Sequence, residues 1–117
     1  MKFVIPGELP DLNQIIKASK AHWADYNNMK REYTALVKLS AGRLPKIDKK
    51  ADIIIRWFAK SKRKDPDNIA AGVKFLLDGL VEAGKLKNDG WNQVNSISHL
   101  FEVDKENPRV EVTIYVL

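Results

Sequence analysis

The sequence contains no cysteine, which excludes disulfide bonds, thiolate zinc sites and cysteine nucleophiles. No apolar run approaches the roughly 20 residues that a membrane-spanning helix needs. The first residues also lack the pattern of a signal peptide. These absences predict a cytoplasmic domain that has no membrane partner.

Several familiar catalytic motifs are missing too. The six glycines form neither a Gly-x-Gly-x-x-Gly nor a Walker loop, so a phosphate-binding loop of these types is not expected. There is no Gly-x-Ser-x-Gly elbow, and acyl transfer therefore has no support. The two histidines, His22 and His99, stand alone without a second histidine at ligand spacing, and we assign neither a function.

The residues that are present indicate one basic globular domain. A length of 117 residues suits a single compact core. Hydrophobic residues make up 44% and charged residues 30% of the chain, which is a globular composition. Lysine and arginine number 20 against 15 acidic residues, and the net charge of +5 suits a polyanionic partner such as nucleic acid. Because the sequence contains no repeat or linker, residues 1–117 are expected to form one domain.

The hydrophobic pattern predicts an α+β fold in which a single mixed sheet is flanked by helices, in the order β-α-α-β-α-β-β. Asp11 is the expected N-cap of the first helix, and the β-branched run Ile53–Phe58 is the expected central strand. The expected elements are a strand at 1–6, one or two helices at 12–39 meeting near Ala24-Asp25, a strand at 53–58, a helix at 66–83, an irregular strand at 93–103, a hairpin-type connection at 104–108 and a strand at 110–116.

Opposite charges meet in the middle of the chain. The basic residues Lys60, Lys62, Arg63 and Lys64 lead directly to Asp65 and Asp67. Both aspartates could cap the helix that begins at Pro66. They could equally bind Mg²⁺, which takes one or two carboxylates together with waters and phosphate oxygens. A third ligand would then come from elsewhere, and Asp89, in the polar turn Asn88-Asp89-Gly90, is a candidate; both interpretations stay open.

The helix expected after Pro66 carries charge on one face. At about 100° per residue, Asp67, Lys74 and Asp78 fall within a stripe of roughly 60°. The opposite side should face the sheet, and it carries Ile69, Val73, Leu76 and Leu80. The charged stripe is either a solvated face with ion pairs, worth about 0.2–0.5 kcal/mol each, or part of a site.

These residues resemble the RusA family of Holliday junction resolvases. The resemblance lies in Asp65-x-Asp67-Asn68, in Lys74 and Asp78 with Leu80, and in Ala83-Gly84-x-x-x-Asn88-Asp89. The opening Ile5-Pro6-Gly7-x-Leu9-Pro10-x-Leu12-Asn13 and the closing Pro108-Arg109-Val110-Glu111-Val112 also resemble the phage-type and Gram-positive-type members. The resemblance therefore covers nearly the whole chain.

The resemblance implies a homodimeric, Mg²⁺-dependent endonuclease that cuts four-way DNA junctions symmetrically. The family's essential acids match Asp65, Asp67 and Asp89, which would hold the metal. Its lysine matches Lys74, although Lys74 follows Asp67 by seven residues instead of four, which moves it along the helix by nearly one turn. Asn88 replaces an aspartate of the family pattern.

Two further sets of residues complete the expected site. Asp78 would orient Lys74 or a metal-bound water. The basic residues Lys60, Lys62, Arg63 and Lys64 would bind the flanking DNA backbone. One alternative is a DNA-binding module without catalysis, in which the acids are caps and ion pairs. Another is a Mg²⁺-dependent enzyme that acts on nucleotides or on other branched DNA, such as flaps.

Overall fold

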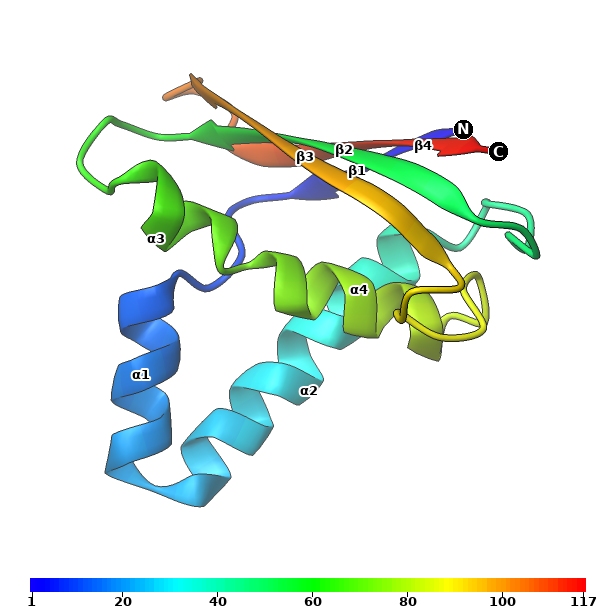
Figure 1. Ribbon diagram of the computed structural model, residues 1–117. Coiled ribbons are helices and arrows are strands. Elements are labelled where there is room, and N and C mark those ends of the chain that lie inside the picture. The colour runs from blue at the N-terminus through cyan, green and yellow to red at the C-terminus, as the bar shows by residue number, and fades with distance from the viewer.

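A four-stranded sheet carries all of the helices on one of its faces (Figure 1). The computed structural model describes residues 1–117. No helix of the chain is both long and apolar enough to cross a membrane. The elements are β1 (Lys2–Pro6), α1 (Leu12–Ala21), α2 (Trp23–Ser40), β2 (Ala51–Ala59), α3 (Pro66–Ala70), α4 (Val73–Glu82), β3 (Val94–Val103) and β4 (Arg109–Val116).

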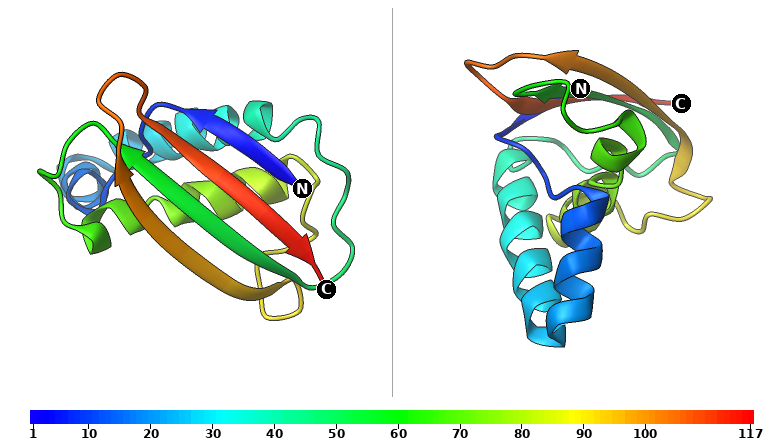
Figure 2. Two further views of the ribbon diagram at one scale, coloured as in Figure 1. Left: turned by 90° about the horizontal axis from the view of Figure 1, so that it is seen from above. Right: turned by 90° about the vertical axis from the view of Figure 1, so that its left-hand side faces the viewer.

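The strands lie in the order β1-β4-β2-β3, as Figure 2 shows from above. β2 pairs antiparallel with β4 and parallel with β3, and α3 and α4 form the crossover that a parallel pair needs. This confirms the predicted α+β class, the mixed sheet and the β-α-α-β-α-β-β order, with β2 in a central position. The hairpin expected at 104–108 is wrong, because β3 and β4 lie on opposite sides of β2. The segment instead passes the end of β2, where the Asp104 N–H donates to the Ala59 carbonyl at 2.8 Å.

The core lies between the sheet and α2 and α4. Alternate residues of β2, such as Ile53 and Ile55, are fully buried and face the helices. From the helix side, Leu76 and Leu80 of α4 are fully buried in the same core, as the helical pattern predicts. At roughly 25 cal/mol per Å² of apolar area removed from water, this layer is the main source of stability.

The helix predicted at 66–83 is interrupted, and a single helix over that range is wrong. α3 ends at Ala70 and α4 begins at Val73. Gly72 lies in the break, and a Cβ there would be 3.0 Å from Leu9 Cβ and 3.2 Å from Trp57 Cη2. The break lets the chain pass close to these side chains, and glycine is a poor helix former as well. As a result, Asp67 does not share a continuous helical face with Lys74.

Helices α1 and α2 form a hairpin, here named the arm, that projects from the helix layer away from the sheet (Figure 2). Asp11 is the N-cap of α1, as predicted, and forms a capping box with Gln14. The two helices meet at His22, slightly before the expected Ala24-Asp25. His22 Nδ1 caps α2 by accepting from the Ala24 N–H at 3.2 Å.

The close approach of α4 to α2 generates a prediction for stability. A Cβ on Gly79 would lie 2.4 Å from Val37 Cβ, so the substitution Gly79→Ala must push the two helices apart. Overpacking typically costs 1–3 kcal/mol, and an overlap as close as 2.4 Å places this variant in the upper part of that range. Alanine regains about 1 kcal/mol of helix propensity, so we expect a net loss of about 1–2 kcal/mol in urea denaturation.

Gly90→Ala is the matched control for this variant. At Gly90 the nearest atom to an added Cβ is Gln93 Oε1, at 3.8 Å, and the unfolding midpoint should stay close to that of the wild type. Equal midpoints for Gly79→Ala and the wild type would contradict the packing argument.

Candidate functional site

The two aspartates at the start of α3 are exposed and unpaired. Asp65 occupies the N-cap position, yet its side chain makes no capping hydrogen bond. Asp67 lies in the first turn of α3, is exposed, and takes part in no ion pair. Pro66 at the first helical position already lacks one of the N–H groups that a cap would satisfy. Neither carboxylate therefore has the structural function of a cap, and both oxygen pairs are available to a cation.

The turn Asp65–Asn68, here named the acidic turn, and the lysine before it contact the opening segment of the chain. Lys64 Nζ lies 2.8 Å from Asp11 Oδ2, and Asn68 Oδ1 accepts from the Asn13 N–H at 3.1 Å. Asp11 is buried, and burial by itself raises the pKa of its carboxyl. The hydrogen bonds from Lys64 and from the Gln14 N–H outweigh that effect and hold the pKa of Asp11 below its ordinary value.

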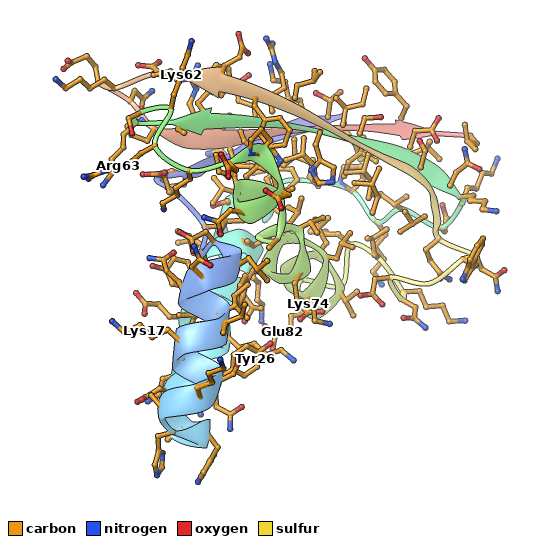
Figure 3. All side chains as sticks on the ribbon, turned by 60° about the vertical axis from the view of Figure 1, so that its left-hand side comes forward. Lys17, Tyr26, Lys62, Arg63, Lys74 and Glu82 are labelled. Carbon is orange, nitrogen blue, oxygen red and sulfur yellow. The ribbon has the colours of Figure 1, made fainter.

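The loop Lys60–Lys64, here named the basic loop, contains two kinds of cation. Lys64, expected to bind DNA, is paired with Asp11 and therefore anchors the loop. Lys60, Lys62 and Arg63 are exposed and have no carboxylate partner, and Lys62 and Arg63 extend outward in Figure 3. Of the four basic residues of this loop, only these three can neutralise phosphates without giving up an existing ion pair.

Along α4, Lys74 and Asp78 form the ion pair that the helical spacing allows, with Lys74 Nζ 3.5 Å from Asp78 Oδ1. A third residue, Lys30 of α2, comes within 3.7 Å of Asp78 Oδ2. The side chain of Asp78 is only 16% exposed, and its Oδ2 is buried without a hydrogen-bond donor. Asp78 thus holds Lys74 in place. The contact between Lys30 and Asp78 could not be predicted from the sequence, because it depends on how α2 crosses α4.

Asp89 lies in the turn after α4 and borders a hollow of about 610 Å³ between α2 and α4. Its N–H donates to Asn88 Oδ1 at 2.7 Å. Asn88 therefore contributes to the turn itself through its side-chain oxygen. The Asp89 carboxylate has no partner within the chain, like those of Asp65 and Asp67.

One copy of the chain does not bring the three predicted metal ligands together. Asp65 lies beside the end of β3 at Phe101–Val103, whereas Asp89 lies beside its start at Val94–Ile97. Six or seven residues of extended strand separate these ends by roughly 20 Å. No three carboxylate or histidine side chains in the chain converge on one point that a metal ion could occupy.

The face of the sheet opposite the helices is not a basic surface. Arg109 binds Asp104 at 2.7 Å and Glu111 at 2.8 Å, and its guanidinium lies 3.8 Å from the centre of the Phe58 ring. Lys2 pairs with Glu111, and Arg56 pairs with Glu102. Because these charges are matched across the strands, the open face of the sheet offers a phosphate few cations that are not already paired.

Sequence comparison gives no independent assignment: no protein-family model matches the chain, and no curated protein matches it either.

The Asp11–Lys64 ion pair should make the free energy of unfolding depend on pH. Asp11→Asn keeps a good capping residue but removes the charge, so it should lower the free energy of unfolding by about 1–3 kcal/mol at pH 7. Because the pKa of Asp11 is lowered in the folded protein, its contribution is present above about pH 4 and disappears as the pH falls through the folded pKa. Denaturation of both proteins between pH 7 and pH 2 should show the two stabilities converging.

A difference in stability that stays constant across this pH range would contradict the assignment. Asp25→Asn, an exposed first-turn carboxylate of α2, is the control and should change stability very little.

Proposed function

We propose that the chain is a Mg²⁺-dependent endodeoxyribonuclease of the RusA type, which resolves four-way DNA junctions by symmetric phosphodiester hydrolysis during recombination and repair. The observation that carries this proposal is the acidic turn. Two carboxylates with no structural partner, Asp65 and Asp67, directly follow three unpaired cations on a loop. Such an arrangement suits a metal ion held against a phosphate of DNA.

The side chains present fit this chemistry. Exposed carboxylate oxygens are the ligands that Mg²⁺ prefers, and Asp65, Asp67 and Asp89 would hold it. A bound Mg²⁺ would supply an activated water and stabilise the charge on the leaving oxygen. Lys74 would bind the scissile phosphate, and Asp78 would keep the ammonium in position, as its 3.5 Å ion pair suggests.

The separation of the aspartates supports a dimer in which each site takes ligands from both subunits. β3 is an edge strand of ten residues whose outer side has no partner. It also exposes apolar side chains, among them Leu100 and Phe101. Exposed edges of this kind pair readily with another strand, and a two-fold axis would pair β3 antiparallel with its own copy.

Antiparallel pairing of this kind would assemble the metal ligands. The end of one β3 would lie beside the start of the other. Asp65 and Asp67 of one subunit would then approach Asp89 of the second subunit. Two equivalent sites would result, one for each of the two strands that a symmetric cut requires.

Cleavage assays test the proposed activity. Asp67→Asn should abolish Mg²⁺-dependent nicking of a synthetic four-way junction while leaving junction binding within about twofold, because the change removes a metal ligand and not a phosphate contact. Asp25→Asn, another exposed first-turn carboxylate, should cut like the wild type.

Other substrates and conditions distinguish the rival functions. Binding without any metal-dependent nicking would favour a non-catalytic DNA-binding module. Faster cleavage of flap DNA, duplex, single strand or free nucleotides would favour a nuclease with another substrate.

A mixing experiment tests the shared sites. Asp67→Asn and Asp89→Asn subunits should each be inactive as homodimers. Co-expressed with different tags and purified as mixed dimers, they should regain nicking of one strand, because one of the two shared sites then has all three aspartates. If each subunit instead held a complete site, both sites of the mixed dimer would be defective and no nicking would return.

Salt dependence tests the basic loop. The slope of log K against log salt changes by about 0.9 for each phosphate contact. The double variant Lys62→Ala/Arg63→Ala should therefore bind a junction with a slope smaller by about 2. Lys64→Ala is the comparison, because Lys64 is already paired with Asp11 and its loss should leave the slope nearly unchanged.

A further inference from the structure

The hollow between the arm and α4 has the features of a binding site for a nucleobase. Its rim runs from Trp23, at the tip of the arm, to Asp89, after α4. Its volume of about 610 Å³ is within the range of sites that enclose small ligands. The hollow is open to solvent. Trp23 at its edge is 72% exposed, although it is among the largest apolar side chains in the chain.

Trp23 contacts the ring of its neighbour His22 at this rim. Its ring stacks on His22, with 5.8 Å between ring centroids and 28° between ring planes. His22 is itself held by the hydrogen bond from the Ala24 N–H, at 3.2 Å. A pre-positioned aromatic ring loses little freedom when a base stacks on it, and such stacking contributes about 1–3 kcal/mol per base.

The other side chains of the hollow suit a base better than a phosphate. The wall on the α4 side carries the carboxylates of Asp78 and Glu82, which repel phosphate and accept hydrogen bonds. Asp78 is already paired with Lys30 and Lys74 and its Oδ2 is buried, so Glu82 is the carboxylate that is free to accept from a ligand. Carboxylates accept from the exocyclic amino groups of bases, and the Asn27 and Asn28 amides of α2 add donors and acceptors.

Positive charge lies close enough to bind the backbone of the same nucleotide. Arg31 lines the hollow and has no carboxylate partner. The helices of the arm carry five basic residues, Lys17, Lys20, Lys30, Arg31 and Lys38, against the two acids Asp25 and Glu32. Backbone contacts of this kind are typical of proteins that bind unpaired strands alongside aromatic platforms.

We propose that this hollow binds an unpaired nucleotide at the branch point of DNA, with Trp23 as the stacking platform and Glu82 as the acceptor for the amino group of the base. The inference rests on the proposed function for its substrate, branched DNA. It adds a site on the arm that reads an unstacked base and leads the strand toward Asp89. An amino-bearing base, such as cytosine or adenine, should bind there better than thymine.

The test uses the full-length protein and a four-way junction with 2-aminopurine at the branch point, in EDTA so that no cleavage occurs. Trp23→Ala should weaken binding about tenfold or more, in keeping with the loss of one stacked base. It should also abolish the change in 2-aminopurine fluorescence that accompanies binding of the wild type. Trp23→Phe, which keeps an aromatic face, should recover most of the affinity and of the signal.

Tyr115→Ala is the control, because Tyr115 is also an exposed aromatic residue, at 56%, and lies on β4 away from this hollow. Its affinity and fluorescence signal should equal those of the wild type. Circular dichroism should show the same helix content in all variants. If Trp23→Ala binds as tightly as Tyr115→Ala with an unchanged fluorescence signal, the inference is wrong.

The outcomes separate this inference from the proposed function. Wild-type protein that binds no branched DNA would overturn both. Wild-type nicking of junctions together with unchanged binding by Trp23→Ala would overturn the Trp23 site alone. Loss of tight binding by Trp23→Ala, with recovery by Trp23→Phe, would support the site even if the protein proved to bind junctions without cutting them.

Discussion

The ion pair between Asp11 and Lys64 is the contact on which the arrangement of the candidate site depends. It joins the N-terminus of α1 to the basic loop, and the hydrogen bond from Asn13 to Asn68 adds a second link one turn further on. Asp11 is buried, and without Lys64 its charge would be compensated only by the backbone N–H groups of the capping turn. The pair therefore couples three features: the direction in which the arm leaves the sheet, the path of the basic loop, and the exposure of Asp65 and Asp67.

A second constraint is the length of α4 and β3, which keeps Asp65 and Asp89 at opposite ends of one subunit. The ten residues of α4 span about 15 Å, and no side-chain rotation can close such a distance. If these aspartates share a metal ion, the chain must use a second copy of itself. A second copy would also cover the long, unpaired and partly apolar β3 edge, because exposed edges of this kind pair readily with another strand.

Patterns that depend on neighbouring residues were predictable from the sequence. The α+β order, the central place of β2, the Asp11 cap and the core face of α4 at Leu76 and Leu80 all follow from short-range periodicity and capping chemistry. The break at Gly72 was not predictable, because its cause is the close approach of Leu9 and Trp57. The partner of Lys64 and the place of Lys30 beside Asp78 depend on tertiary packing in the same way. Sequence motifs grouped the three aspartates, whereas the fold of a single chain separates them.

The distribution of charge narrows the path that a DNA strand can take. On the open face of the sheet, Arg109, Arg56 and Lys2 are already paired, so phosphates would have to displace existing carboxylates there. The basic loop and the arm carry cations without such partners, among them Lys62 and Arg31, and the arm lies on the helix side of the sheet (Figure 1). A duplex bound at the loop would therefore run toward the angle between the arm and α4, where Trp23 and Asp89 border the same hollow. A flat duplex has no unstacked base to offer such a hollow, whereas a branch point does, and this difference in shape is the physical basis on which the protein could select branched DNA.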